Sequence, residues 1–207
     1  MARTRRAEIV EIVAVLVGFQ AYLCWRPSLA ADLTALGLLA LLVPLLLWRR
    51  GETPRSVGLT DLGAQGRALV PLAAVAGLIV AGCIVFRLLH APLRPTGGVR
   101  ALLVALAVYP IWGLAQQVLY LAFVLRGLER AGLPGAAVVG LTAIAFGLVH
   151  QPNWPVCALT AGMGAVFALV YRRQPALLLI AAVHGLAGAL ALKVVGLDLE
   201  IGARYIR

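Results

Sequence analysis

The strongest constraint on this chain is a succession of seven apolar stretches, most of them near the length that crosses a bilayer. They cover residues 8–25, 30–48, 68–86, 101–125, 136–150, 156–171 and 175–192. In hydrocarbon a backbone has no water to bond with, and a helix satisfies its hydrogen bonds within one segment. The sequence therefore predicts an all-α polytopic transmembrane helical bundle of about seven spans, within a range of six to eight. We expect it to form a single integral membrane domain over residues 1–207.

Composition and charge exclude other classes of protein. The chain is 62% hydrophobic and 13% charged, whereas soluble domains are about a quarter charged. Its net charge of +10 comes from 18 Lys and Arg residues against 8 acidic ones, but the cations are spread thinly between apolar stretches instead of being gathered on one face, and no aromatic-basic platform accompanies them. We therefore expect no nucleic-acid partner. The partners that we expect are membrane lipids and a peptide or membrane protein, and we expect no cofactor.

The distribution of Lys and Arg predicts the orientation. With the N-terminus inside, the larger share of the 18 cations falls in inner segments, as the positive-inside rule requires. We expect the plasma (inner) membrane of a bacterium with the N-terminus in the cytoplasm. An alternative is a cleaved signal peptide, because a basic start precedes the first apolar stretch and Ser28-Leu29-Ala30 resembles a cleavage site. Glu8 and Glu11 near the start of that stretch favour a helix that enters the membrane from its interface.

A few polar residues lie where the bilayer should exclude them. They are Gln116 and Gln117 in the fourth stretch, His150 at the end of the fifth, Asn153 in the turn after it and His184 in the seventh. That turn, residues 151–155, is uncharged and contains two prolines, so the fifth and sixth stretches are expected to form a helical hairpin. Helix rise places the polar groups of three helices at a similar depth. The sequence predicts that they face one shared wet pocket, although an interhelical hydrogen-bond cluster would give the same pattern.

The order of these residues resembles the CPBP superfamily, the CAAX-protease and bacteriocin-processing intramembrane proteases. The resemblance rests on the polar pair, on Phe146-x-x-x-His150 leading into Pro152-Asn153, and on His184 in a later helix, and it covers residues 101–192. In that family a Glu-Glu-x-x-x-Arg motif, a Phe-x-x-x-His motif and a His-x-x-x-Asn motif surround a cavity. The resemblance implies that the first Glu and first His activate water, while the later His and the Asn stabilise an oxyanion.

The chain departs from the family pattern at the positions to which the family's catalytic chemistry is assigned. Gln116 and Gln117 occupy the two Glu positions, Leu121 stands where the motif has Arg, and Gly188 replaces the Asn. A carboxamide is not protonated near neutral pH, so Gln116 is able to orient a water but not to serve as its base. Gly188 lacks the side-chain donor of an oxyanion hole, a loss that elsewhere costs about 100- to 1,000-fold in rate. The absence of the Arg is consistent with the absence of the two carboxylates, because burying an Arg without a counterion costs free energy.

Two functions follow as hypotheses. The first is peptide-bond hydrolysis, with His150 polarising water, His184 steadying the oxyanion and Gln116 orienting the water. The second is a catalytically inactive relative that binds a membrane protein or peptide as a chaperone or regulator. In both, the cavity is bordered by Gln117, Phe146, Asn153 and Gly188. A small carrier is a weaker third alternative, because no paired repeats are present. We expect no metal, since two His residues without a third ligand fall short of zinc's usual set.

Overall fold

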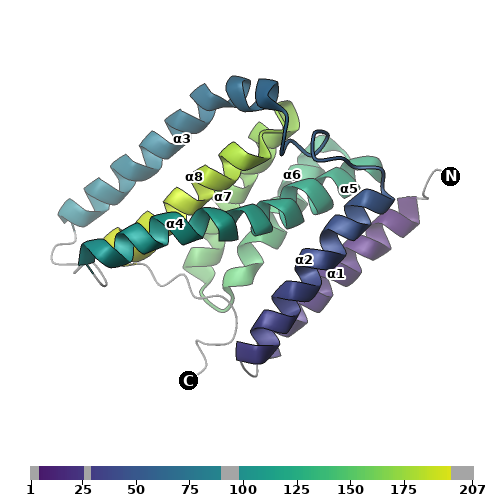
Figure 1. The fold of residues 1–207 in the computed structure, drawn as a ribbon, viewed down its shortest axis with the longest axis horizontal. Helices are drawn as coiled ribbons and strands as arrows, with labels where there is room; N and C mark the ends of the chain where they lie inside the picture. The colour runs from purple at the N-terminus through teal and green to yellow at the C-terminus, as the bar shows by residue number, and fades with distance from the viewer. Residues whose placement is uncertain (1–4, 26–28, 90–97, 197–207) are drawn as a thin grey trace. The chain divides into compact units, whose positions relative to one another are not determined.

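The computed structural model describes residues 5–25, 29–89 and 98–196, and this part of the chain is built from helices and turns with no strand (Figure 1). Its elements, in chain order, are α1 (Arg5–Trp25), α2 (Leu29–Arg49), α3 (Leu62–Leu89), α4 (Gly98–Gln117), the π-helix η1 (Val118–Leu125), α5 (Arg126–Arg130), α6 (Gly135–Gly147), the 3-10 turn η2 (Leu148–His150), α7 (Trp154–Arg173), α8 (Leu177–Leu190) and the π-helix η3 (Ala191–Val195).

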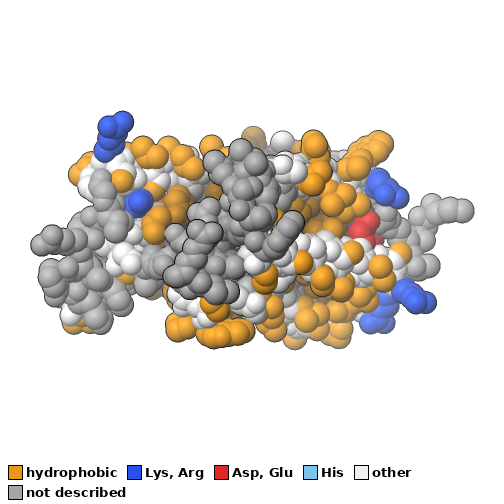
Figure 2. Space-filling view, turned by 90° about the horizontal axis from the view of Figure 1, so that it is seen from below, with side chains coloured by type: hydrophobic (Ala, Val, Ile, Leu, Met, Phe, Trp, Pro, Cys, Tyr) orange, Lys and Arg blue, Asp and Glu red, His pale blue; other side chains and the backbone are white. Residues whose placement is uncertain are grey.

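Each of the seven apolar stretches falls on a helix, which confirms the predicted fold class. Within the described ranges, five helices are long and apolar enough to cross a membrane: residues 5–24, 62–82, 98–130, 154–173 and 177–195. Two further apolar helices, Gly37–Arg49 and Gly135–His150, are shorter. Hydrophobic side chains are spread over much of the face drawn in Figure 2, and Leu41, Val70 and Ile111 are each more than 70% exposed. Such a surface suits hydrocarbon and would be unfavourable in water.

Contacts divide the chain into two compact units. The first unit includes α1, α2, η1, α5, α6 and nearly all of α7. Its core is centred on η1, where every residue from Leu119 to Leu125 is buried, together with Leu23 and Phe167. α6 and α7 form the expected hairpin: a Cβ on Gly147 would lie 2.5 Å from the Cys157 carbonyl oxygen, so the two backbones touch there.

A cluster of charged side chains joins α1, α2 and α5 in this first unit. Arg50, just after α2, contacts Glu11 at 2.6 Å and Glu8 at 3.1 Å, and its Nη1 donates to the Phe123 carbonyl oxygen at 3.0 Å. Its guanidinium also lies 4.1 Å from the centroid of the Phe123 ring. Burial lowers the pKa of Arg50, while its hydrogen bond to Glu11 and the charges of Glu8 and Glu11 act in the opposite direction.

The second unit contains α3, α4, α8 and η3. The first backbone N–H groups of a helix have no partner within it, and in α8 those of Leu177 and Leu179 donate to the Gly58 carbonyl oxygen and to Gln65 Oε1, both at 3.1 Å. Gln65 Nε2 in turn donates to the Gly58 oxygen at 2.6 Å. Gly58 has a φ of +80°, and any Cβ there would collide with the Pro175 carbonyl. The loop before α3 is thereby held against the start of α8.

Candidate functional site

The clearest polar contact between helices of the second unit joins the end of α4 to α8. Gln117 Nε2 lies 2.9 Å from His184 Nδ1, and the Gln117 side chain is among the most deeply buried in the chain, at 1% exposure. An amide nitrogen is only able to donate, so Nδ1 accepts and the neutral imidazole carries its proton on Nε2. The pair is therefore an interhelical hydrogen bond. Such a bond was the alternative to a catalytic role for these polar residues.

Glycines bring the two backbones together at this level. A Cβ on Gly185, the residue after His184, would lie 2.5 Å from the Pro110 backbone nitrogen. A Cβ on Gly113, one turn before Gln117, would lie 2.8 Å from the Ala181 carbonyl oxygen. Small residues at both positions allow α4 and α8 to approach closely, and this approach places the glutamine within hydrogen-bonding distance of the imidazole.

Two other expected site residues, Gln116 and Gly188, belong to the same unit. Gln116 is buried, at 8% exposure. Gly188, one turn after His184, faces an aromatic ring, since a Cβ there would lie 2.7 Å from Tyr109 Cδ1. The space that the family's asparagine would need is thus taken up by the Tyr109 ring.

The remaining expected residues lie on the α6–α7 hairpin of the first unit. His150 ends η2 and is half-buried. Phe146, one turn earlier, is buried, and its ring packs nearly perpendicular to the Tyr120 ring at a centroid distance of 5.2 Å. Asn153 Oδ1 accepts a hydrogen bond from the Val156 N–H at 3.3 Å, as an N-cap does at the start of a helix. Asn153 therefore has a structural role at the start of α7.

Sequence reasoning missed one residue beside His150. Gln20 in α1 donates from Nε2 to the Leu148 carbonyl oxygen at 3.2 Å and to Gln151 Oε1 at 3.3 Å. These two acceptors flank His150 in the chain, so hydrogen bonds from α1 hold the turn that contains the histidine in place. Gln20 is a polar residue inside the first apolar stretch, and the criterion that singled out Gln116 would have found it too.

The acids whose side chains the structure describes are all engaged elsewhere. Glu8 and Glu11 pair with Arg50, Glu52 with Arg126 and Arg130, and Glu129 with Arg172, while Asp61 Oδ1 accepts the Ala64 N–H at the start of α3. Each of these carboxylates therefore already has a partner outside the motif positions. Among the described residues, no three His, Cys, Asp or Glu side chains gather as a metal ion would require.

The structure therefore brings Gln117 and His184 together, in the unit that also contains Gln116 and Gly188. Phe146, His150 and Asn153 are grouped in the other unit. Convergence of His150 with Gln116 and His184 on one pocket stays a prediction.

Comparison with known families supports the resemblance seen in the sequence. Residues 98–190, from the start of α4 to the end of α8, match the family model described as type II CAAX prenyl endopeptidase Rce1-like. This segment is Rce1-like. The match confirms the expected resemblance to the CPBP superfamily over this segment, which includes all seven expected site residues. No curated protein and no solved structure matched the chain. With its apolar helices, the chain is a CAAX protease-like integral membrane protein.

Proposed function

We propose that this protein binds a peptide or membrane-protein client through the carbonyl groups of the client and does not hydrolyse it. The observation that carries the proposal is the hydrogen bond from Gln117 Nε2 to His184 Nδ1 at 2.9 Å. With Nδ1 accepting, the imidazole presents an N–H at Nε2, which is a donor suited to a carbonyl oxygen. The client is the partner class that the family match makes plausible.

The same hydrogen bond argues against His184 as part of a water-activating pair. Where the motif's arginine balances its charge, a carboxylate at position 117 would accept the proton of Nδ1 and leave the lone pair of Nε2 free to take a proton. The amide reverses this arrangement, and neither Gln116 nor Gln117 is able to take up a proton near neutral pH. The site is thus equipped to donate a hydrogen bond but lacks a base on the helix where the family has one.

A second candidate function is peptide hydrolysis by a water that His150 polarises. It is favoured by one observation: the match to the endopeptidase family extends across α6, η2 and α7, where Phe146 and His150 retain the family's spacing. In this mechanism the imidazole of His150 would accept the proton of the water, and His184 Nε2–H would stabilise the oxyanion.

The two functions are separated by one experiment. The purified protein in detergent is mixed with a lipidated peptide or a transmembrane peptide carrying a photo-crosslinker, and both crosslinking and cleavage products are measured by mass spectrometry. We expect saturable crosslinking without cleavage. Cleavage that disappears in His150→Ala would establish the second function and overturn the first. Absence of saturable crosslinking and of cleavage for both peptides would overturn both.

A matched pair of variants tests the role of the His184 proton. Asparagine places its amide near the position of Nδ1, so His184→Asn keeps a partner for Gln117 but removes the donor at Nε2. Glutamine reaches the position of Nε2, so His184→Gln keeps a donor there. We expect the Asn variant to lose peptide crosslinking and the Gln variant to retain most of it. Equal crosslinking in the two variants would contradict the proposed role.

We further propose that the protein resides in the plasma (inner) membrane of a bacterium with its N-terminus in the cytoplasm. The bias of Lys and Arg toward the segments that this orientation places inside supports it. Single cysteines introduced into the 51–60 loop and labelled with a membrane-impermeant maleimide test it, because in intact cells this loop should stay unlabelled.

A further inference from the structure

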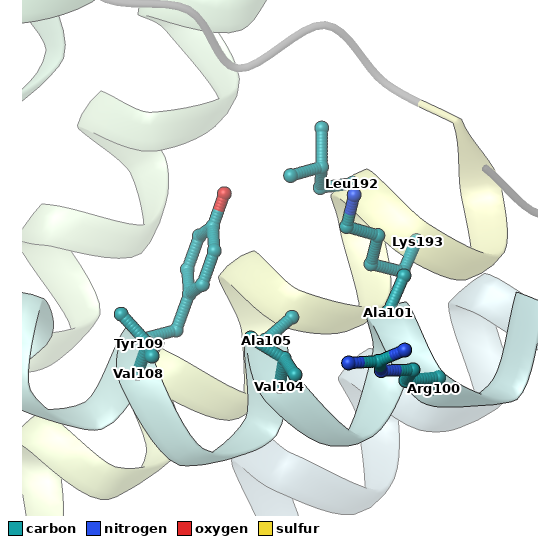
Figure 3. A pocket seen from close by; sticks show the side chains of 8 residues that line it. All are labelled: Arg100, Ala101, Val104, Ala105, Val108, Tyr109, Leu192 and Lys193. Carbon is teal, nitrogen blue, oxygen red and sulfur yellow. The ribbon is translucent and has the colours of Figure 1, made fainter. Parts of the chain in front are cut away.

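A groove runs along the surface of the second unit, between the first half of α4 and η3 (Figure 3). Its volume is about 460 Å³, within the range of small-molecule and lipid sites. Arg100 and Lys193 stand at one end, and Tyr109 stands at the other with its hydroxyl directed into the open space (Figure 3). The groove is independent of the hydrogen bond on which the proposed function rests.

The two cations lie where a membrane-spanning segment meets the headgroup region. Arg100 is the third residue of the span that begins at Gly98, and Lys193 is the third from the end of the span that closes at Val195. They come from different helices and converge on one end of the groove. Neither forms an ion pair with any residue that the structure describes. This end of the groove is therefore complementary to an anion.

The wall of the groove is apolar and follows one face of α4. Ala101, Val104, Ala105 and Val108 line it, and their spacing of i, i+3, i+4 and i+7 puts them on a single helical face. The two alanines make this face concave. From Arg100 to Tyr109 the helix rises about 13 Å, which is enough to accommodate a large part of an acyl chain. Two of the lining side chains, Val104 and Val108, are 56% and 53% exposed, so the groove opens at the surface of the bundle.

We propose that this groove binds an anionic phospholipid. The phosphate lies between Arg100 and Lys193, and one acyl chain lies along the four apolar residues of α4. Basic pockets between transmembrane helices bind anionic headgroups in this way. A free phosphate would bind the two cations but leave the apolar wall without a partner. A zwitterionic lipid would pack against the wall but gain less electrostatic attraction from the cations. The combination of both features selects a lipid with a net negative headgroup.

The test measures lipid binding to the full chain by native mass spectrometry in a neutral detergent. The protein is titrated with phosphatidylglycerol, with phosphatidylcholine of the same acyl chains, and with phosphatidylglycerol in the presence of inorganic phosphate. We expect one phosphatidylglycerol to bind more tightly than phosphatidylcholine, and millimolar phosphate to displace little of it. Equal affinity for the two lipids, or complete displacement by phosphate, would overturn the proposal.

Two kinds of variant locate the site. Arg100→Gln combined with Lys193→Gln should weaken phosphatidylglycerol binding about 25-fold, because each cation near a membrane surface contributes about fivefold. Arg67→Gln combined with Arg173→Gln removes the same charge from two exposed positions of the same unit outside the groove, and should change binding less than threefold. Equal losses in the two double variants would mean non-specific attraction and would refute the site.

A third variant tests the apolar wall without changing any charge. Val104 is 56% exposed, so Val104→Trp should be tolerated by the fold and should fill the groove. We expect it to lower the affinity for phosphatidylglycerol at least tenfold while both cations remain. Unchanged affinity would show that the acyl chain does not lie in the groove, and it would overturn the proposal even if the charge variants behaved as expected.

Discussion

The ion cluster around Arg50 allows a stability change to be worked out from the structure. The perturbation is Arg50→Met, which keeps an apolar stem but removes the guanidinium. The Arg50 side chain is 1% exposed and that of Glu8 is 4% exposed, and they lie 3.1 Å apart. Glu11 lies 2.6 Å from Arg50 and is 17% exposed. After the substitution, two carboxylates would share a buried site without their main counterion.

Breaking a buried ion pair by removing one partner costs about 3–5 kcal/mol. Two features of the structure place the cost of Arg50→Met near the lower end of this range. Arg130 lies 3.5 Å from Glu8 and still neutralises part of its charge, and Glu11 keeps some contact with solvent. The lost contacts of Arg50 with the Phe123 carbonyl and ring add to the cost. We expect Arg50→Met to lower the free energy of unfolding by about 3–4 kcal/mol.

Removing the two carboxylates as well should restore most of the lost stability, because most of the loss comes from carboxylates left without a counterion. Combining Arg50→Met with Glu8→Gln and Glu11→Gln removes both charges, and a neutral replacement of a buried ion pair is often close to neutral in stability. We expect the triple variant to be within about 1 kcal/mol of the native protein. The assay is reversible unfolding in mixed micelles with SDS, followed by circular dichroism. The reasoning is refuted if the single variant loses less than 1 kcal/mol, or if the triple variant is no more stable than the single one.

Three further predictions concern the site and its supports. Gly185→Ala should lower the free energy of unfolding by about 1–3 kcal/mol in the same assay, because the added Cβ would meet the backbone of Pro110. The control is Gly162→Ala, whose Cβ would have nothing within 4 Å and which should change that free energy by less than about 0.5 kcal/mol. Gln20→Leu should lose about 1–2 kcal/mol from two hydrogen bonds, and hydrogen exchange should rise over residues 148–153 but stay unchanged in α8. In ¹⁵N NMR spectra, His184 should be protonated on Nε2 and bare on Nδ1. Gln117→Glu should add a proton on Nδ1 while Nε2 keeps its own; an Nδ1–H in the native protein would contradict the tautomer.

The helices were predictable from the sequence because the bilayer leaves so few alternatives. Each apolar stretch has to become a helix to satisfy its own backbone, and all seven stretches do so. The criterion of polar residues in apolar stretches also found both partners of the Gln117–His184 hydrogen bond. These successes rest on local properties of the chain, namely composition and the cost of burying a polar group.

What the sequence did not predict depends on contacts between distant residues. Gly162, Gly164, Gly185 and Gly188 look equivalent as small residues of membrane helices, yet Gly162 has nothing within 4 Å and the other three face a neighbouring chain segment. The contact of Tyr109 with Gly188 and the cluster around Arg50 join residues far apart in the chain. Their partners are set by how helices pack, which helical periodicity alone does not specify.

The changes in the family motif are best understood as one neutral replacement. Gln117 is 1% exposed, so a glutamate there would be a buried carboxylate and would need a cation to stabilise it. The family supplies an arginine four residues on, but this chain has Leu121, itself 1% exposed. In Gln117→Glu the nearest candidate cation is therefore His184, which would take up a proton and lose its lone pair. Restoring the glutamates alone should then produce a Glu–imidazolium pair and not an active base. Recovery of peptidase activity by Gln116→Glu and Gln117→Glu without an arginine at position 121 would show that this coupling is wrong.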